Sequence, residues 1–269
     1  MGDPTSVEDL IEEALDIGEA ALQSRNPSPE IHEKESTRDF ATDADISVER
    51  AISRFFGKST QNVPIIGEEL TSNVAASASE GEFWVIDPID GTANFSHDIP
   101  LFGICITLIR DGQAFACGVS FPRLRERYVG IRGRGAFLNG ERLSVSRHAS
   151  METAIVGFGD FAVGNQREKK NKFRYELISR LGNDCLRVRM LGSAALQLAW
   201  LAAGRVDISV TMSNRAWDVQ AGVLLVRESG GLVFDGDGIE HSIASACTLA
   251  TNGATLKEQL LVRFRASDA

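Results

Sequence analysis

Three groups of acidic residues follow or open short apolar segments, and together they could hold a metal ion. The groups are Glu68 with Glu69 after NVPIIG, Asp87 with Asp90 after FWVI, and Asp218 before VQAGVLLV. Side chains at strand ends and helix starts can converge in one cleft although they lie far apart in the sequence. Oxygen ligands without histidine or cysteine favour a hard cation, and Mg²⁺ is the common biological choice.

The nonapeptide DPIDGTANF, residues 87–95, places two of these acids around a proline. The proline fixes its own φ angle and holds the preceding residue extended, so Asp87, Asp90 and the carbonyl of Ile89 could face one point. Gly91 allows a ligand to approach the backbone closely, and Thr92 offers an amide and a hydroxyl at a helix N-terminus. The segment is therefore predicted to supply cation ligands and phosphate donors together.

Each of these features also has a simpler structural interpretation. DPID could be a turn with solvated acids, and Asp218 could only cap a helix, although capping and metal binding are compatible. The sequence LGSAALQLAW is typical of a tightly packed helix, and the DGDG at 235–238 is typical of a turn rather than a calcium loop. The alternating arginines Arg123, Arg125 and Arg127 could contact RNA, but they are also what the solvated face of a strand shows.

The first part of the chain combines helical and strand patterns. A capping box of Ser6 and Asp9 starts an amphipathic helix over residues 6–23, and a second helix is predicted over 46–56 after a polar stretch, 33–45. Apolar runs between 83 and 131 predict a meandering antiparallel sheet, with a tight turn at Asp111-Gly112. A small hairpin with its turn at 139–140 leads to a boundary near residue 150.

Beyond residue 150 the pattern alternates. Strands are predicted at AIVGF, LRVRML, VDISVT and LVFD, and helices at KKNKFRYELISRL, SAALQLAWLAAG, DVQAGVLLVRESG and from Leu256 to the end. Such alternation favours an α/β arrangement with helices covering a sheet. We therefore predict two parts, an α+β part over 1–149 with most of the metal ligands and a smaller α/β part over 150–269 with Asp218 and the pocket for the substrate alcohol.

Composition excludes several classes of protein. The 269 residues are 43% hydrophobic and 24% charged, as in an ordinary globular protein, and the net charge of −9 argues against nucleic acid as the main partner. The four cysteines form no CxxC pair, which predicts buried thiols in a reducing cytoplasm. No basic and apolar leader is visible, and no apolar run approaches the roughly 20 residues of a membrane span, so no membrane partner is expected.

Several motifs, in order along nearly the whole chain, resemble the Mg²⁺-dependent, lithium-sensitive phosphatases of the inositol monophosphatase family. DPIDGTANF is similar to that family's DPIDGTTNF, with Ala93 for a threonine, and WDVQAG at 217–222 is similar to WDxAAG, with Gln220 for an alanine. GEE at 67–69, ATDAD at 41–45, LGSAA at 191–195 and ESGG at 228–231 also match. GEE alone is a weak signal, whereas the ordered set is highly specific.

The resemblance implies a role for individual residues. The implied metal ligands are Glu68, Asp87, the carbonyl of Ile89, Asp90 and Asp218, for two to three Mg²⁺ ions. Asp45 and Thr92 are implied to polarise the attacking water, with Glu68 as a further catalytic residue. The implied substrate contacts are the amides of Gly91 and Thr92 for phosphate, Gly192, Ser193 and Ala194 on the alcohol side, and Asp90, Thr211 and Asp218. Lys34 and Asp39 match a segment that contributes to a third, weaker metal site, and Glu69 is expected to point away as a structural residue.

The resemblance also implies a fold and an activity. Family members are usually homodimers with five αβαβα layers, here an antiparallel N-terminal sheet and a smaller C-terminal α/β half. The expected activity is hydrolysis of a small polyol or sugar phosphate, inositol 1-phosphate being the best single candidate. Inositol-specific members carry a glutamate where this chain has Thr211, so histidinol phosphate, fructose 1,6-bisphosphate and 3'-phosphoadenosine 5'-phosphate are alternatives. Asn214 and Arg215, in the same segment, could reach a different alcohol that bears a carboxylate or a second phosphate. A protein that mainly binds a regulatory partner is the alternative from another class.

Overall fold

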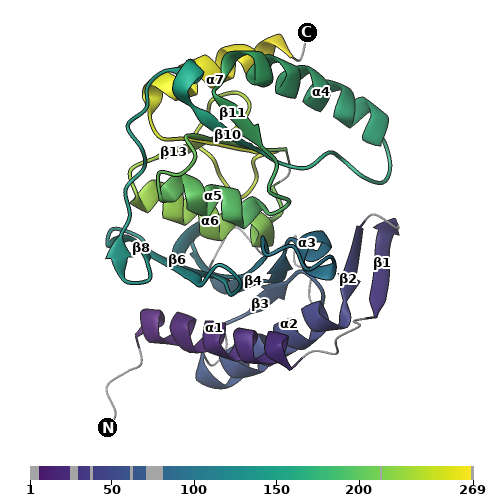
Figure 1. Ribbon diagram of the computed structural model, residues 1–269. Helices are drawn as coiled ribbons and strands as arrows, with labels where there is room; N and C mark the ends of the chain where they lie inside the picture. Colours follow the sequence, from purple (N-terminus) through teal and green to yellow (C-terminus); the bar gives the residue numbers. More distant parts are fainter. Residues whose placement is uncertain are drawn as a thin grey trace.

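Helices and sheets alternate in five layers, as the sequence predicts (Figure 1). The computed structural model describes residues 6–24, 30–36, 39–60, 63–70, 81–212 and 214–267. From one side to the other the layers are helices α1 and α2, a larger sheet, helices α5 and α6, a smaller sheet, and helices α4 and α7. The helices are α1 (Val7–Gln23), α2 (Asp43–Ser59), α3 (Thr92–Ser96), α4 (Arg167–Asp184), α5 (Ala194–Ala202), α6 (Ala216–Glu228) and α7 (Ala254–Ala266), with a 3-10 turn η1 (Met151–Thr153).

The first helical layer forms as its capping and apolar pattern predict. The Ser6 hydroxyl accepts the amide of Asp9, whose carboxylate accepts the amide of Ser6, so the capping box at the start of α1 is confirmed. Ile11 lies on the apolar face of α1 and is fully buried against the sheet. A Cβ at Gly118 would lie 2.3 Å from Ile11, so this glycine allows the helix to approach the sheet closely.

The larger sheet carries most of the candidate site. Within the described residues its order is β3-β4-β5-β6-β7-β8-β9. The strands are β3 (Ile65–Gly67), β4 (Glu82–Asp90), β5 (Gly103–Arg110), β6 (Gln113–Phe121), β7 (Glu126–Ile131), β8 (Gly135–Leu138) and β9 (Glu141–Arg142). Asp111, Gly112, Asn139 and Gly140 all have positive φ angles, which confirms both predicted hairpin turns.

The antiparallel sheet predicted over 83–131 is confirmed, and β3 adds a parallel strand at one edge. β3 pairs with β4 in parallel, with Ile65 opposite Trp84 and Gly67 opposite Ile86, whereas the remaining pairs are antiparallel. Parallel strands end at the same edge of a sheet. The residues that follow Gly67 and Ile86 therefore lie side by side, and these residues are Glu68 and Asp87.

The polar stretch before the second helix is a hairpin that the sequence pattern does not predict. β1 (Ile31–Ser36) pairs antiparallel with β2 (Asp39–Thr42), and α2 begins at Asp43, three residues before the predicted start. Neither strand shows alternating apolar residues, so nothing in their composition distinguishes them from a loop. The hairpin lies at the edge of the molecule beside α3 (Figure 1).

The smaller sheet is mixed, with the order β11-β10-β12-β14-β13. Its strands are β10 (Ile155–Phe158), β11 (Arg187–Arg189), β12 (Ile208–Thr211), β13 (Leu232–Phe234) and β14 (Thr248–Thr251). β10 pairs in parallel with β11 and β12, whereas β14 is antiparallel to β12 and β13. β14 was not predicted from the sequence.

Helices α5 and α6 lie between the two sheets (Figure 1). A Cβ at Gly222 of α6 would lie 2.5 Å from the Cβ of Leu198 in α5, so the two helices pack very closely. One apolar cluster contains residues of the larger sheet, such as Val119, together with Leu198 and Leu225 from these helices. The division into parts 1–149 and 150–269 stays a prediction, and this cluster spans it.

The arginines that could have contacted RNA lie differently from the prediction. Arg123 and Arg125 are exposed in the turn before β7, and only Arg127 is in the strand. The Arg127 guanidinium lies 2.9 Å from Glu12 and 2.8 Å from Asp16 of α1. It therefore ties the helix to the sheet. In the part of the chain that is described, no helix has the length and apolarity needed to cross a membrane.

Candidate active site

A cavity of about 680 Å³ collects almost all of the residues that the sequence singled out. Residues far apart along the chain, from 68 to 218, line this one cavity. The singled-out residues on its wall are Glu68, Asp87, Ile89, Asp90, Gly91, Thr92, Gly192, Ser193, Ala194, Thr211 and Asp218. Asp45 is not on the wall, since it is 1% exposed, but it contacts the hydroxyl of Thr92, which is.

Three carboxylates form the acidic end of the cavity. Glu68 follows β3, Asp87 lies in β4 and Asp218 is in the first turn of α6. One carboxylate oxygen from each lies within 4.8 Å of the others. Burial, together with the neighbouring acids, raises the pKa of Asp87 and of Asp218 well above the usual range. A cluster of oxygen donors that repel one another fits a divalent cation such as Mg²⁺.

The DPID segment is a bulged continuation of β4, and not the end of the strand. Asp87 lies opposite Cys105 and Asp90 lies opposite Gly103, so β4 contains one extra residue between these positions. Residues three apart on a regular strand point to opposite faces, and one extra residue turns both toward the same face. The bulge therefore explains how Asp87 and Asp90 both reach the cavity, and the amide of Ile89 donates to Asp87 Oδ1 at 3.0 Å.

Asp90 is held by the N-terminus of α5. The Ser193 hydroxyl and the amides of Ala194 and Ala195, at 3.2 and 2.9 Å, donate to its carboxylate. Burial raises the pKa of Asp90 to about 6, although these hydrogen bonds favour the charged form. Ala195 was not singled out from the sequence, because its contribution is a backbone amide at a helix start.

Two glycines with positive φ angles allow the segments around Asp90 to meet. Gly91 (φ 91°) precedes α3, and a Cβ there would lie 3.0 Å from the carbonyl oxygen of Leu101 and 3.1 Å from that of Gly192. Gly192 (φ 69°) is equally confined, since a Cβ there would lie 2.8 Å from the side-chain nitrogen Nδ2 of Asn94. The Asn94 side chain donates to the carbonyls of Leu101 and Leu191 at 2.7 and 2.8 Å, which fixes this crossing.

Thr92 and Asp45, which the family resemblance implies as the pair acting on water, are hydrogen-bonded. The Thr92 hydroxyl lies 3.2 Å from Asp45 Oδ1 and 3.1 Å from the carbonyl of Ile89. The second Asp45 oxygen accepts the amide of Thr42 at 2.7 Å, in the capping box that starts α2. Burial raises the pKa of Asp45, while the Thr42 hydrogen bonds lower it.

A buried glutamate that the sequence did not single out supports Glu68. Glu49 of α2 is fully buried, and its carboxylate accepts the amides of Glu69 and Leu70 at 2.7 and 2.9 Å. The segment after β3 is thereby fixed to the helix. A Cβ at Gly67 would lie 2.0 Å from Glu49 Oε1, so any larger residue there would displace this carboxylate.

Lys34 of the β1–β2 hairpin reaches the acidic end of the cavity. Its amino group lies 2.8 Å from Glu68 and 2.5 Å from Glu69. Glu69 is not on the cavity wall, so its structural role stays a prediction. Burial lowers the pKa of Lys34, but the two glutamates outweigh burial and raise it above the usual range. The Asp39 side chain, expected near the same place, lies outside the described part of the structure.

Thr211 and Arg215 also lie on the cavity wall. Thr211 Oγ1 accepts the side-chain amide of Gln197 at 2.7 Å, and Arg215 lies 3.9 Å from Glu68. Asn214 was expected to contact the substrate alcohol. Its amide instead donates to the carbonyls of Ser242 and Ile243, both at 3.2 Å, and it is not on the cavity wall.

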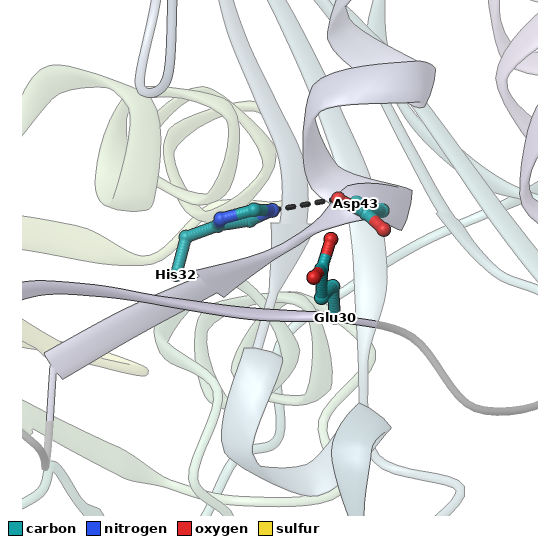
Figure 2. Close-up of side chains that lie close together, drawn as sticks. All are labelled: Glu30, His32 and Asp43. Atoms are coloured by element: carbon teal, nitrogen blue, oxygen red, sulfur yellow. Dashed lines mark hydrogen bonds and ion pairs between the residues drawn. The ribbon is translucent and has the colours of Figure 1, made fainter.

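A second cluster of possible metal ligands lies outside the cavity. Figure 2 shows Glu30 and Asp43 beside His32, whose Nε2 is 2.6 Å from Asp43 Oδ1. All three residues are exposed, and the hydrogen bond to Asp43 raises the pKa of His32. An exposed histidine–aspartate ion pair accounts for this contact without a metal.

Comparison with known proteins identifies the family. The family model described as the inositol monophosphatase family matches residues 3–269. The chain is 34% identical to a fructose-1,6-bisphosphatase/inositol-1-monophosphatase of Thermotoga maritima, over 83% of this chain and 82% of the relative. It is 36% identical to the Nus factor SuhB of Escherichia coli K12, over 88% and 87%. The solved structure of a Thermotoga maritima inositol monophosphatase matches with a TM-score of 0.83 and 30% identity, covering 96% of this chain and 95% of that one.

Proposed function

Because the chain belongs to the inositol monophosphatase family and is a phosphatase of phosphate monoesters, we propose that it hydrolyses a small polyol or sugar phosphate with Mg²⁺. Inositol 1-phosphate is the best single candidate for the substrate. The observation that carries the proposal is the trio Glu68, Asp87 and Asp218 in the same cavity as the Thr92–Asp45 pair. No covalent protein intermediate is required, because phosphoryl transfer depends mainly on positioning and charge neutralisation.

In this proposal the residues divide into two groups. Glu68, Asp87, Asp90, Asp218 and the carbonyl of Ile89 would hold two to three Mg²⁺ ions. When bound, these ions would neutralise the phosphate and make a water molecule more acidic. The remaining steps belong to the side chains and amides of the protein.

The second group places the water and the phosphate. The Thr92 hydroxyl, which has a single proton, donates it to Asp45 and accepts a hydrogen bond from the attacking water, with Glu68 as a second acceptor. Water oxygen bonds to phosphorus as the bond to the alcohol oxygen breaks, and the water's proton leaves toward these carboxylates. The released alkoxide takes up a proton from solvent water and leaves as the alcohol. The amides of Gly91 and Thr92 hold phosphate oxygens, and the segment 192–194 faces the leaving alcohol.

The part of the pocket that would bind the substrate alcohol differs from that of inositol-specific family members. The position at which inositol-specific family members carry a glutamate is Thr211, whose hydroxyl already accepts a hydrogen bond from Gln197. Histidinol phosphate, fructose 1,6-bisphosphate and 3'-phosphoadenosine 5'-phosphate therefore remain candidate substrates. The name of the Thermotoga maritima relative, which includes a fructose bisphosphatase, supports keeping a bisphosphate among them.

Phosphate release from a panel of these monoesters tests the proposal. We expect turnover with Mg²⁺, inhibition by Li⁺, and loss of activity in Asp90→Asn. Asp111→Asn is the matched control, because it removes the same charge from an exposed hairpin turn where asparagine tolerates the positive φ angle. An absence of turnover on every ester by the native protein would refute the enzymatic proposal.

A regulatory binding role is the second candidate, supported by the similarity to the Nus factor SuhB. If it is the main role, a cellular function should survive in Asp90→Asn while phosphatase activity is lost. We also propose a homodimer, a cytoplasmic location and the division into parts 1–149 and 150–269. Sedimentation of the purified protein would test the first of these.

A further inference from the structure

A buried arginine on the cavity wall has no ionic partner among the described residues. Arg174 of α4 is 8% exposed and lines the same cavity as the acidic cluster. In the described part of the chain its Nε finds no hydrogen-bond acceptor, and its other contacts are long, 3.4 Å to Asn171 Oδ1 and 3.5 Å to the carbonyl of Met212. Among the described residues, no carboxylate lies within ion-pair distance of this guanidinium.

Burial of such a cation is unfavourable unless something compensates it. Other arginines of this protein that lose solvent contact have acidic partners, as Arg127 has on α1 and Arg263 has in Asp184 at 2.7 Å. Burial lowers the pKa of Arg174, and no neighbouring acid opposes that effect. Asp160, on the same cavity wall, does not provide compensation, since its own pKa is raised by burial with no contribution from a cation. A ligand with a negative charge would supply what is missing.

The position of Arg174 separates it from the acidic cluster. Its Nη2 approaches the carbonyl of Met212, the residue after Thr211, whereas Arg215 is the arginine near Glu68. Lys170 lies one helical turn before Arg174, is exposed, and also lines the cavity. Residues four apart share one face of a helix, so both cations are presented by the same side of α4.

We propose that Arg174, with Lys170 at the rim, binds a second anionic group on the alcohol part of the substrate. Preferred substrates are then small phosphomonoesters that carry a phosphate or a carboxylate besides the phosphate that is released. The inference rests on the proposed phosphatase function and names Arg174 as a residue that determines specificity. A guanidinium can donate two parallel hydrogen bonds to either anion.

Two pairs of substrates separate the sources of this anion. Fructose 1-phosphate is compared with fructose 1,6-bisphosphate for a second phosphate, and glycerol 1-phosphate is compared with 3-phosphoglycerate for a carboxylate. In at least one pair the native protein should show a kcat/KM for the anionic member that is about tenfold to a hundredfold higher, as expected for hydrogen bonds to a buried charge. The effect should lie mainly in KM.

Variants assign the preference to the two cations. Arg174→Gln should remove most of the preference for the anionic member and leave kcat/KM for the less charged member within about twofold. Arg174→Lys should retain part of that preference. Lys170→Gln, at an exposed position, should reduce the preference by about twofold to fivefold. Lys172→Gln is the matched control, because it removes the same charge from an exposed position of α4 outside the cavity.

The inference and the proposed function can fail separately. Turnover without an anion preference, or an equal loss on both members of a pair in Arg174→Gln, would overturn the role of Arg174 and leave the phosphatase intact. If no ester is hydrolysed, calorimetric measurement of the binding of the same four compounds tests the anion subsite directly. Tighter binding of the anionic members that depends on Arg174 would support the subsite without the activity, and equal binding would overturn the subsite.

Discussion

Replacing Asp87 by asparagine should stabilise the metal-free protein while it abolishes metal binding. Asp87 is 1% exposed, and oxygens of Glu68 and Asp218 lie within 4.8 Å of its carboxylate. Two unit charges at that distance repel by about 3.5 kcal/mol at an effective dielectric constant of about 20. The native protein avoids part of this repulsion by binding protons, so we expect a gain of about 1–3 kcal/mol in the free energy of unfolding. Asparagine keeps the oxygen that accepts the Ile89 amide, so no hydrogen bond is lost.

Denaturant and thermal unfolding, each with EDTA and with Mg²⁺, measure both effects. In EDTA the gain should raise the melting temperature by about 2–4 °C per kcal/mol in a chain of this size. In Mg²⁺ the native protein should gain stability and Asp87→Asn should gain almost none, since a ligand stabilises only the state that binds it. Asp111→Asn controls for the change in net charge. The reasoning is refuted if Asp87→Asn is less stable than the native protein in EDTA.

Three further predictions concern the same cavity. Thr92→Val should lower kcat by about 10²–10⁴-fold, because the hydroxyl links Asp45 to the water. Thr92→Ser keeps a hydroxyl and should therefore retain most of the native kcat. An unchanged kcat in the valine variant excludes that link. Glu49→Gln leaves one backbone amide without an acceptor, so it should lower the free energy of unfolding by about 1–3 kcal/mol. It should also weaken Mg²⁺ binding, measured by calorimetry, by about 10–100-fold. An unaltered Mg²⁺ affinity would mean that Glu68 does not need the support of Glu49. Burial raises the pKa of Asp90 to about 6, above that of an unfolded aspartate, so the contribution of this group to metal-free stability should be lost as the pH rises from about 4 to above 6. Added Mg²⁺ should abolish that loss, and a Mg²⁺ effect on the melting temperature that does not grow over this range would contradict the prediction.

Much of the site could be predicted because its signals are local. The Asp111-Gly112 turn depends on two residues that tolerate positive φ angles, and the α1 capping box on Ser6 and Asp9. The acids of the cavity also stand in short motifs. Such features require only neighbouring residues, so the sequence alone carries them.

The features that were missed depend on contacts between distant segments. The parallel pairing of β3 with β4 joins strands that no local pattern relates, and the polar β1–β2 hairpin lacks an alternating pattern. Glu49 resembles one more solvated acid of an amphipathic helix until the segment after β3 lies against it. Arg174 has the same character in KKNKFRYELISRL, where every polar residue could face solvent. Its burial is a consequence of where α4 lies.

The hydrogen bonds of Asp90 limit what this carboxylate can do. An ionised carboxylate offers about four lone-pair positions, two on each oxygen. Oδ2 uses both, for the Ser193 hydroxyl and the Ala195 amide, whereas Oδ1 uses one, for the Ala194 amide. One position therefore remains, on Oδ1, so Asp90 can bind one cation and cannot bridge two without losing a contact to α5. The bulge in β4 turns Asp90 toward the cavity, and α5 decides which of its oxygens remains free.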